Sequence, residues 1–247
     1  MSVLRFFIDD CQSTIDNRQS TILNVSRQLS FYDKLTPPET EAERLVRMQR
    51  YERMAYQEGT EFVAGVDEAG RGCLAGPVVA AAVILARDWS LPDVNDSKQL
   101  TASQRDKLFP LIQEQAISVG VGIIPATTID KVNILQATYL AMEQAIDTLE
   151  ITPQYLLLDA VTLKNVLIPQ RGITKGDSLS ISIAAASIIA KVTRDRLMID
   201  YDKQYPQYGF AGHKGYGTKQ HRHAIATHSP CPIHRKTFRG VKEYLKS

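Results

Sequence analysis

From Glu61 onward, short apolar segments typical of β-strands alternate with longer segments whose apolar residues have helical spacing. We expect strands over 62–67, 78–85, 116–124, 155–159 and 166–169, and helices over 102–115, 127–149 and 180–201. A glycine-rich turn joins the first two strands. This order of segments predicts a mixed α/β fold.

The first 60 residues differ from the rest of the chain, because they are polar, contain a single glycine (Gly59) and have helical spacing. Thr36 can cap free helix amides just before two prolines, so we expect a helix from there to about Gln57. One apolar stripe of this helix is expected to dock on the body of the protein, formed by Leu45, Met48 and Tyr51 or Ala55. We therefore predict a helical N-terminal extension over 1–60 and a second domain over 61–247.

The composition excludes several classes of protein. Hydrophobic residues make up 44% and charged residues 23% of the 247 residues, which is typical of a folded globular chain. The longest apolar segments, such as Val78 to Ala86, fall short of the roughly 20 residues that span a bilayer. Cys11, Cys73 and Cys231 lie far apart, so no disulfide framework is indicated. We expect a cytoplasmic protein without a membrane segment.

Basic residues gather at the C-terminal end, although the formal net charge of the chain is only +2. Residues 203–247 contain nine Lys or Arg and one acidic residue, Glu243, and all five histidines lie in the same segment. This segment is a candidate surface for nucleic acid phosphates. A basic segment that is merely solvated remains an alternative.

Carboxylates stand at the ends of two predicted strands and at the start of a helix. Asp67 and Glu68 follow one apolar strand, Asp159 ends another, and Asp177 precedes the helix over 180–201. Asp67 and Glu68 could instead be structural or solvated acids, Asp159 could start a turn, and Asp177 could be a helix cap or a first-turn acid. If these carboxylates meet in space, their repulsion requires a cation, and an oxygen-only set favours Mg²⁺ or Mn²⁺. Two such ions can promote hydrolysis of a phosphodiester.

Adjacent residues of a strand point to opposite faces, so Asp67 and Glu68 cannot both reach one site unless the strand ends between them. We therefore expect Glu68 to contribute through its backbone carbonyl or a water molecule. The glycines that flank Arg71, Gly70 and Gly72, would allow a ligand to approach the backbone closely. A phosphate loop is disfavoured, because no Lys-Ser/Thr pair completes that motif.

Polar residues of the last helix and of the basic segment are further candidates. Ser187, Lys191 and Arg194 fall on one face of the predicted helix over 180–201, and that face suits phosphates. Tyr216 lies between two glycines and follows Lys214, so its ring could stack on a sugar or base. A half-buried core tyrosine remains an alternative. The histidines lack a well-supported zinc-finger spacing.

Six motifs together closely resemble those of the bacterial ribonuclease HII family, over about Phe62 to Phe238. They are Gly65-Val66-Asp67-Glu68-Ala69-Gly70-Arg71-Gly72, Asn95-Asp96-Ser97-Lys98, Leu158-Asp159, Lys175-Gly176-Asp177, Ile183-Ala184-Ala185-Ala186-Ser187 and His213-Lys214-Gly215-Tyr216. The resemblance implies an α/β ribonuclease H-like fold, which is a five-stranded mixed sheet flanked by helices with a C-terminal helical part. Residues 61–247 would then form a type 2 ribonuclease H catalytic domain.

The resemblance also implies roles for individual residues. Catalysis and metal binding would fall to Asp67, Glu68, Asp159 and Asp177, with Mg²⁺ or Mn²⁺ as cofactor. Nucleic acid would be bound by Gly70, Arg71, Gly72, Asn95, Lys98, Ser187, Lys191, Arg194, Lys214 and Tyr216. In the family the Gly-Arg-Gly turn reads the 2′-hydroxyl, and the tyrosine stacks on the following sugar. The related type 3 enzymes carry Gly-Lys-Gly, so Arg71 favours type 2.

The implied activity is endonucleolytic hydrolysis of the RNA strand of RNA:DNA hybrids by two metal ions, leaving a 5′-phosphate and a 3′-hydroxyl. Substrates would include DNA duplexes with single embedded ribonucleotides, as in ribonucleotide excision repair, and we expect the protein to act as a monomer. Two other classes stay open at this point. One is a non-catalytic nucleic-acid-binding module, which the presence of all four acids disfavours, and the other is a zinc-stabilised interaction protein.

Overall fold

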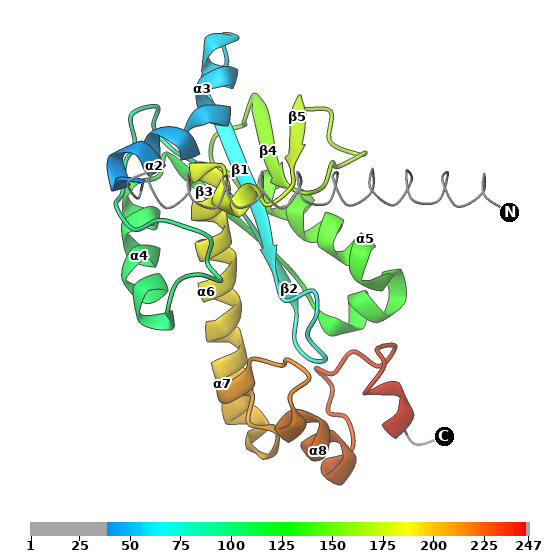
Figure 1. Ribbon diagram of the computed structural model, residues 1–247. Helices are drawn as coiled ribbons and strands as arrows, with labels where there is room; N and C mark the ends of the chain where they lie inside the picture. The colour runs from blue at the N-terminus through cyan, green and yellow to red at the C-terminus, as the bar shows by residue number, and fades with distance from the viewer. Residues whose placement is uncertain (1–38, 246–247) are drawn as a thin grey trace, which may run out of the picture. The chain divides into compact units, whose positions relative to one another are not determined.

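The computed structural model describes residues 39–245. From Arg44 on, the described residues form one compact unit. Its centre is a five-stranded sheet with helices on both faces, so the predicted mixed α/β fold is confirmed (Figure 1).

The strands are β1 (Val63–Ala69), β2 (Val78–Ile84), β3 (Ser118–Ile124), β4 (Tyr155–Asp159) and β5 (Gln170–Ile173). Their order in the sheet is β3-β2-β1-β4-β5. The three strands β1, β2 and β3 pair antiparallel, whereas β4 lies parallel to both β1 and β5. The parallel pairing puts the carboxyl ends of β1 and β4 at the same edge of the sheet.

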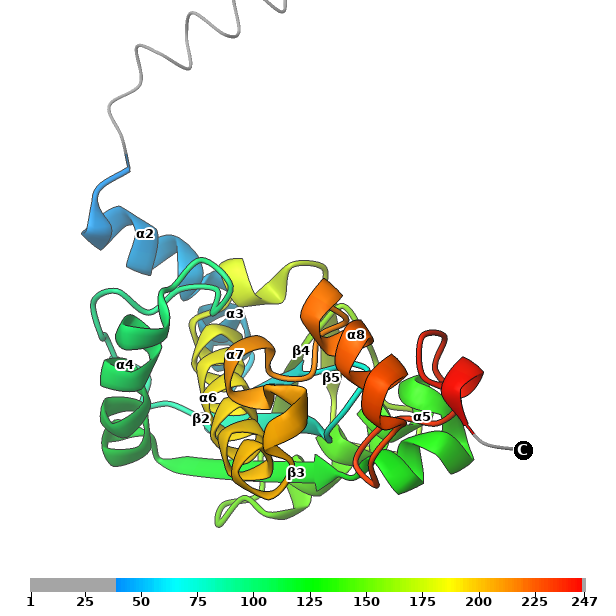
Figure 2. The same cartoon turned by 90° about the horizontal axis from the view of Figure 1, so that it is seen from below.

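The apolar strand β2 supplies both faces of the core, because its successive side chains alternate between them. Ala81 and Val83 pack with helix α6 (Ile181–Gln204) and helix α4 (Ala102–Gln115). Ala80 and Ala82 pack on the other face with helix α5 (Ala126–Asp147). The helices α4 and α5 therefore lie on opposite sides of the sheet (Figures 1 and 2).

Two sequence predictions within this core need correction. The last strand is not 166–169 but Gln170–Ile173. Leu167 is almost fully exposed, and the strand itself begins with two polar residues, Gln170 and Arg171. The long helix predicted over 127–149 is interrupted at Asn133, which has a φ of 69°. The Asn133 side chain accepts hydrogen bonds from the amides of Leu135 and Gln136, and so caps the second part of α5.

The N-terminal helix is also divided. Instead of one helix to Gln57, the described residues form α2 (Glu41–Met48) and α3 (Arg50–Gln57). The predicted start at Thr36 lies outside the described residues. Met48 and Ala55, from the predicted apolar stripe, are buried. Glu52 is buried as well and bonds to the start of α6, which the apolar pattern did not indicate.

Short helices follow α6 at its C-terminal end, where α7 (Phe210–His213) and α8 (Lys219–His228) lie (Figures 1 and 2). Met198, Tyr208 and Phe210 form a small core there. Three 3-10 turns complete the described elements: η1 (Gly176–Ser178), η2 (Pro206–Tyr208) and η3 (Lys242–Tyr244). No helix in the described part of the chain is long and apolar enough to cross a membrane.

Candidate active site

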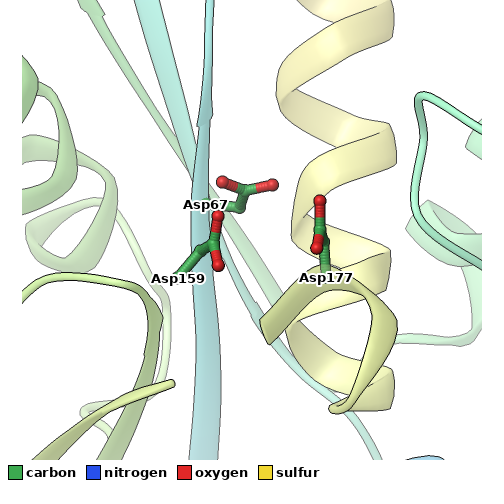
Figure 3. A group of neighbouring side chains, drawn as sticks. All are labelled: Asp67, Asp159 and Asp177. Atoms are coloured by element: carbon green, nitrogen blue, oxygen red, sulfur yellow. The ribbon is translucent and has the colours of Figure 1, made fainter. Parts of the chain in front are cut away.

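Three aspartates from separate parts of the chain meet at one edge of the sheet. Asp67 lies on β1, Asp159 ends β4, and Asp177 lies in η1. Each offers a carboxylate oxygen, and these oxygens lie within 4.8 Å of one another. Figure 3 shows the three carboxylates directed toward a common point.

The sheet register brings these aspartates together. Val66 pairs with Leu158, so the next residues along the two parallel strands, Asp67 and Asp159, are neighbours. Asp159 then holds the following turn, because its Oδ1 accepts a hydrogen bond of 2.8 Å from the Gly176 amide. That bond fixes η1, and with it Asp177, beside the end of β4.

Two of the aspartates, Asp67 and Asp159, are in an environment that disfavours their ionised forms. Burial raises the pKa of Asp67 well above its usual range, and repulsion from Glu68 and Asp159 raises it further. Burial also raises the pKa of Asp159, with a further contribution from Asp177. A cation between the carboxylates would relieve both the repulsion and the loss of hydration. The oxygen-only ligands fit a hard divalent cation such as Mg²⁺ or Mn²⁺.

Lys98 supplies one positive charge to this cluster, since its Nζ lies 2.9 Å from Oδ2 of Asp177. The Lys98 side chain is 74% exposed while that of Asp177 is 5% exposed, so the lysine reaches in from solvent. Because the Asp177 carboxylate is buried, it needs a positive partner. Lys98 can leave Asp177 where a cation takes its place.

Glu68 does not belong to the cluster of three aspartates, but it lines the same cleft and is close enough to raise the pKa of Asp67 by repulsion. Strand β1 continues through Ala69, so the side chains of Asp67 and Glu68 start on opposite faces. Oε1 of Glu68 accepts a hydrogen bond from Arg71 at 3.2 Å. Within the described residues its buried Oε2 has no hydrogen-bond partner. An unpartnered buried carboxylate oxygen beside the cluster is a further feature that suits a cation or its hydration water.

The carboxylates of Asp67, Glu68 and Asp159 open onto a cleft of about 220 Å³. Many of the nucleic-acid-binding residues expected from the sequence line the same cleft: Gly70, Arg71, Gly72, Lys98, Ser187, Lys191 and Tyr216. Ser187 connects two parts of it, because its hydroxyl lies 2.7 Å from that of Ser97 and also bonds to Asp67. Ser97 belongs to one of the six motifs but was not singled out, since a serine in a loop carries no periodic signal.

Tyr216 stands at the rim of the cleft with 44% of its surface exposed. The Nζ of Lys191 lies 5.6 Å from the centre of its ring, and its hydroxyl bonds to the buried thiol of Cys73. The ring is thus held at one edge while part of its surface faces solvent. Such a surface can stack on a sugar or a base.

Three of the expected nucleic-acid-binding residues lie away from the cleft lining. Asn95 uses its side-chain oxygen to accept a hydrogen bond from the Asp96 amide. The Lys214 ammonium donates to the carbonyl of Ala211. Arg194 is fully buried, and its guanidinium donates to the carbonyls of Ala75, Pro77 and Lys214. Its position on the helix face suggested a phosphate contact, but its donors are used inside the protein.

Arg235, which the sequence did not indicate, is likewise fully buried and donates to backbone carbonyls of residues 70–77. In the sequence it is one basic residue among many in a segment expected to be exposed. Only its neighbours in space distinguish it from a solvated arginine.

The histidine-rich end does not form a metal centre in the described part of the chain. His221 and His234 share a hydrogen bond of 3.0 Å between their Nε2 atoms, and Nδ1 of His234 accepts from the Cys231 amide. Within residues 39–245 the three aspartates are the one group of three or more acidic, His or Cys side chains with ligand atoms this close. The geometry therefore gives no support to a zinc-stabilised interaction protein.

Known proteins are similar to this chain in sequence and in fold. A family profile described as Ribonuclease HII matches residues 64–241. Ribonuclease HII of Geotalea uraniireducens is 59% identical over 197 residues, which cover 80% of this chain and 91% of that protein. Ribonuclease HII of Ruminiclostridium cellulolyticum is 52% identical over 240 residues, or 97% of this chain and 93% of that protein.

The crystal structure of ribonuclease H2 from Pyrococcus horikoshii OT3 superimposes with a TM-score of 0.61 at 30% identity, over 74% of this chain and 96% of that chain. These comparisons confirm the resemblance that the six motifs carry. The chain therefore belongs to the ribonuclease HII family and is a metal-dependent endoribonuclease that acts on RNA paired with DNA.

Proposed function

We propose that this protein hydrolyses the RNA strand of RNA:DNA hybrids, including single ribonucleotides embedded in duplex DNA, and leaves a 5′-phosphate and a 3′-hydroxyl. The observation that carries the proposal is the composition of one cleft. It joins Asp67 and Asp159 of the aspartate cluster to a glycine turn and to a partly exposed tyrosine ring.

The acids Asp67, Asp159 and Asp177 would hold Mg²⁺ or Mn²⁺, with Glu68 acting from the side through its unpartnered oxygen or through water. Two bound ions would activate a water molecule and stabilise the leaving oxygen of the phosphodiester. The protein itself fixes where the phosphate lies, because Lys98 and Lys191 line the same cleft and attract its charge.

Discrimination of a ribonucleotide requires contact with one oxygen atom, because the 2′-hydroxyl is what distinguishes it from its DNA neighbours. Gly72 suits this contact, since a Cβ built on it would meet no protein atom within 4 Å. Its lack of a side chain is thus not required by packing and leaves room for a sugar. The Tyr216 ring would stack on the next sugar and favour a deoxyribose there.

We also propose that the protein acts as a monomer. A nuclease that removes ribonucleotides from DNA would serve ribonucleotide excision repair in the bacterial cytoplasm.

The proposal is tested with two substrates: a DNA duplex with one ribonucleotide, and a long RNA:DNA hybrid, each with Mg²⁺, with Mn²⁺ and without metal. We expect metal-dependent cleavage of both substrates by the wild type, and its near abolition by Asp67→Asn or Asp159→Asn. Cleavage of neither substrate would contradict the proposed activity. Near wild-type rates in either aspartate variant would contradict the assignment of the aspartates.

Tyr216 is tested by the ratio of the cleavage rates on these two substrates. Tyr216→Ala should lower the rate at the single ribonucleotide more than the rate on the hybrid, where many binding registers are available. Tyr216→Phe keeps the ring and should lose less. A ratio unchanged by Tyr216→Ala would remove the ring from the recognition mechanism.

A further inference from the structure

The Gly70-Arg71-Gly72 turn rests on a buried guanidinium from the C-terminal segment. Arg235 has no exposed surface, and its Nη atoms donate to the carbonyl oxygens of Gly70 and Arg71, both at 2.7 Å. Its other hydrogen bonds reach the carbonyls of Gly76 at 3.1 Å and Pro77 at 3.2 Å. Within residues 39–245 no carboxylate forms an ion pair with Arg235. Its charge is therefore compensated by these backbone carbonyl dipoles and by the face of the Phe238 ring, whose centre lies 5.1 Å from the guanidinium carbon.

By holding the carbonyl groups of the turn, Arg235 also fixes the direction of the amide groups in the same peptide planes. All the described peptide bonds are trans, and in a trans peptide the C=O and N–H point in opposite directions. The Gly70 carbonyl shares its peptide plane with the Arg71 amide, and the Arg71 carbonyl with the Gly72 amide. Because Arg235 holds both carbonyls, both N–H groups point away from it.

These two amides have no protein acceptor in the described part of the chain. Both residues line the cleft beside the aspartates, and Arg71 and Gly72 are exposed. The turn thus presents two N–H donors to whatever occupies the cleft. Donors held in place before binding lose little entropy when a ligand accepts their hydrogen bonds.

Arg235 itself is held in place, because its own backbone is hydrogen-bonded to the loop that its side chain supports. The Arg235 amide donates to the Leu74 carbonyl at 2.9 Å, and His234 pairs with Ala75 in a β-bridge. Beneath the same loop Arg194 donates to the carbonyls of Ala75 and Pro77. Arg194 supports the far part of the loop, whereas Arg235 is the arginine bonded to Gly70 and Arg71.

We propose that Arg235 is a positioning residue for ribonucleotide discrimination, which aims the Arg71 and Gly72 amides at the 2′-hydroxyl without touching the substrate. The inference rests on the proposed function, since it concerns the same cleft. A lysine at this position keeps the charge but cannot bridge four carbonyls, because it lacks the fixed fork of a guanidinium. Arg235→Lys should therefore loosen the turn more than it changes the electrostatics of the cleft.

The test compares affinities rather than rates, using fluorescence anisotropy with Ca²⁺ in place of Mg²⁺. The two probes are a duplex with one ribonucleotide and the same duplex made entirely of DNA. Arg235→Lys should reduce the wild-type preference for the ribonucleotide by about tenfold, which corresponds to losing one or two hydrogen bonds. Affinity for the DNA duplex should change little.

The matched control for lost stability is Ile112→Ala, which alters the fully buried core under α4. This variant should melt at a lower temperature and keep the wild-type preference. An unchanged preference in folded Arg235→Lys would overturn the inference, as would an equal loss of preference in Ile112→Ala. A wild type that does not prefer the ribonucleotide would instead contradict the proposed function.

If Arg235→Lys does not fold, the wild type labelled with ¹⁵N-arginine gives a second measurement. The Nη signals of Arg235, whose atoms donate to Gly70 and Arg71, should shift when the ribonucleotide duplex binds and should stay in place with the DNA duplex. Nη signals that respond identically to both duplexes would overturn the inference.

Discussion

Gly70 and Gly72 look equivalent in the sequence, but the structure gives them different reasons for being glycine. Gly70 has a φ of 96°, and a Cβ on it would lie 2.0 Å from Nε of the buried Arg194. Gly72 has open space where its Cβ would point. The fold therefore requires a glycine at position 70, whereas at position 72 a glycine is explained by the ligand that the cleft accepts.

Alanine substitutions separate these two reasons. Gly70→Ala should lower the free energy of unfolding by on the order of 1–3 kcal/mol, through backbone strain and the clash with Arg194. Gly72→Ala should melt within about a degree of the wild type but lose roughly tenfold or more in affinity for a ribonucleotide duplex, because a methyl group blocks the sugar. Thermal melts and binding titrations check both. Wild-type binding by Gly72→Ala would show that no ligand approaches this backbone.

At the scale of elements, helix α3 is joined to the start of α6 by a buried carboxylate. Oε1 of Glu52 accepts hydrogen bonds from the Ser180 hydroxyl at 2.5 Å, the Ser182 amide at 3.0 Å and the Ser182 hydroxyl at 2.7 Å. Ser180 is also the N-cap of α6. Glu52 thus stabilises the end of α6 that lies next to η1 and Asp177.

Burial raises the pKa of Glu52 above 4.5 despite these hydrogen bonds, so the protein should lose stability as pH rises. The unfolded chain releases the proton first, and this loss begins near pH 4.5 and ends above the folded pKa. Glu52→Gln cannot ionise, so its unfolding free energy in urea should not show this decline. The exposed Glu58→Gln is the matched control and should follow the wild type. Parallel pH profiles for wild type and Glu52→Gln would contradict this account.

A chain of neutral imidazoles supports the Tyr216 turn. The Cys231 amide donates to Nδ1 of His234, so the proton of that ring is on Nε2 and is donated to Nε2 of His221. Nδ1 of His221 then carries its proton toward the Tyr216 carbonyl, 2.9 Å away. A further proton on either ring would place two donors face to face.

Burial lowers the pKa of both His221 and His234 from 6.5 to about 4, so this chain of imidazoles should make the fold sensitive to acid. Between pH 6.5 and about pH 4 the unfolded chain takes up protons at these two histidines that the folded protein excludes. The free energy of unfolding therefore decreases as pH falls. His234→Gln should show a smaller drop in the urea midpoint from about pH 7 to about pH 5 than the wild type. The control His223→Gln changes an exposed residue of α8 and should keep the wild-type drop. An equal drop in all three proteins would exclude the imidazoles as the cause.

At the scale of the whole molecule, a bound cation would tie together segments that are far apart in the sequence. The aspartates come from β1, β4 and η1, and their mutual repulsion opposes folding when no cation is present. Because the pKa of Asp67 is raised, the metal-free protein loses stability as pH rises through that pKa. A cation that binds only the folded state reverses this loss.

Mg²⁺ at about 100 times its dissociation constant should stabilise the wild type by roughly 2.7 kcal/mol. Asp67→Asn should be at least as stable as the wild type without metal and should gain much less from Mg²⁺. Differential scanning calorimetry with and without Mg²⁺ measures both quantities, and Asp106→Asn, an exposed residue of α4, serves as the control. Equal stabilisation of wild type and Asp67→Asn would contradict metal binding at Asp67.

The sequence by itself determined the order of strands and helices, the aspartate that ends β4, and the family. These features are local, because an apolar run sets a strand and the residue after it stands at the strand's end, although β1 continues two residues beyond Asp67 to Ala69. Helix α4 and strand β4 were predicted with the bounds that the structure has. The edge strand β5 was misplaced because its polar residues carry no alternation. The boundary between an N-terminal extension and the catalytic domain at residue 60 stays a prediction.

Only the tertiary structure decided which polar residues face the cleft. Arg194 and Lys191 lie on the same helix three residues apart, yet one is buried under a loop and the other lines the cleft. Arg235 and Glu52 were not singled out in the sequence, yet both are buried and form several hydrogen bonds. Burial and hydrogen-bond partners arise from contacts between residues more than 100 positions apart, as between Glu52 and Ser182 or Arg235 and Gly70. The local spacing of residues does not indicate such contacts, so the burial and the hydrogen-bond partners of these charged residues are decided only when the chain folds.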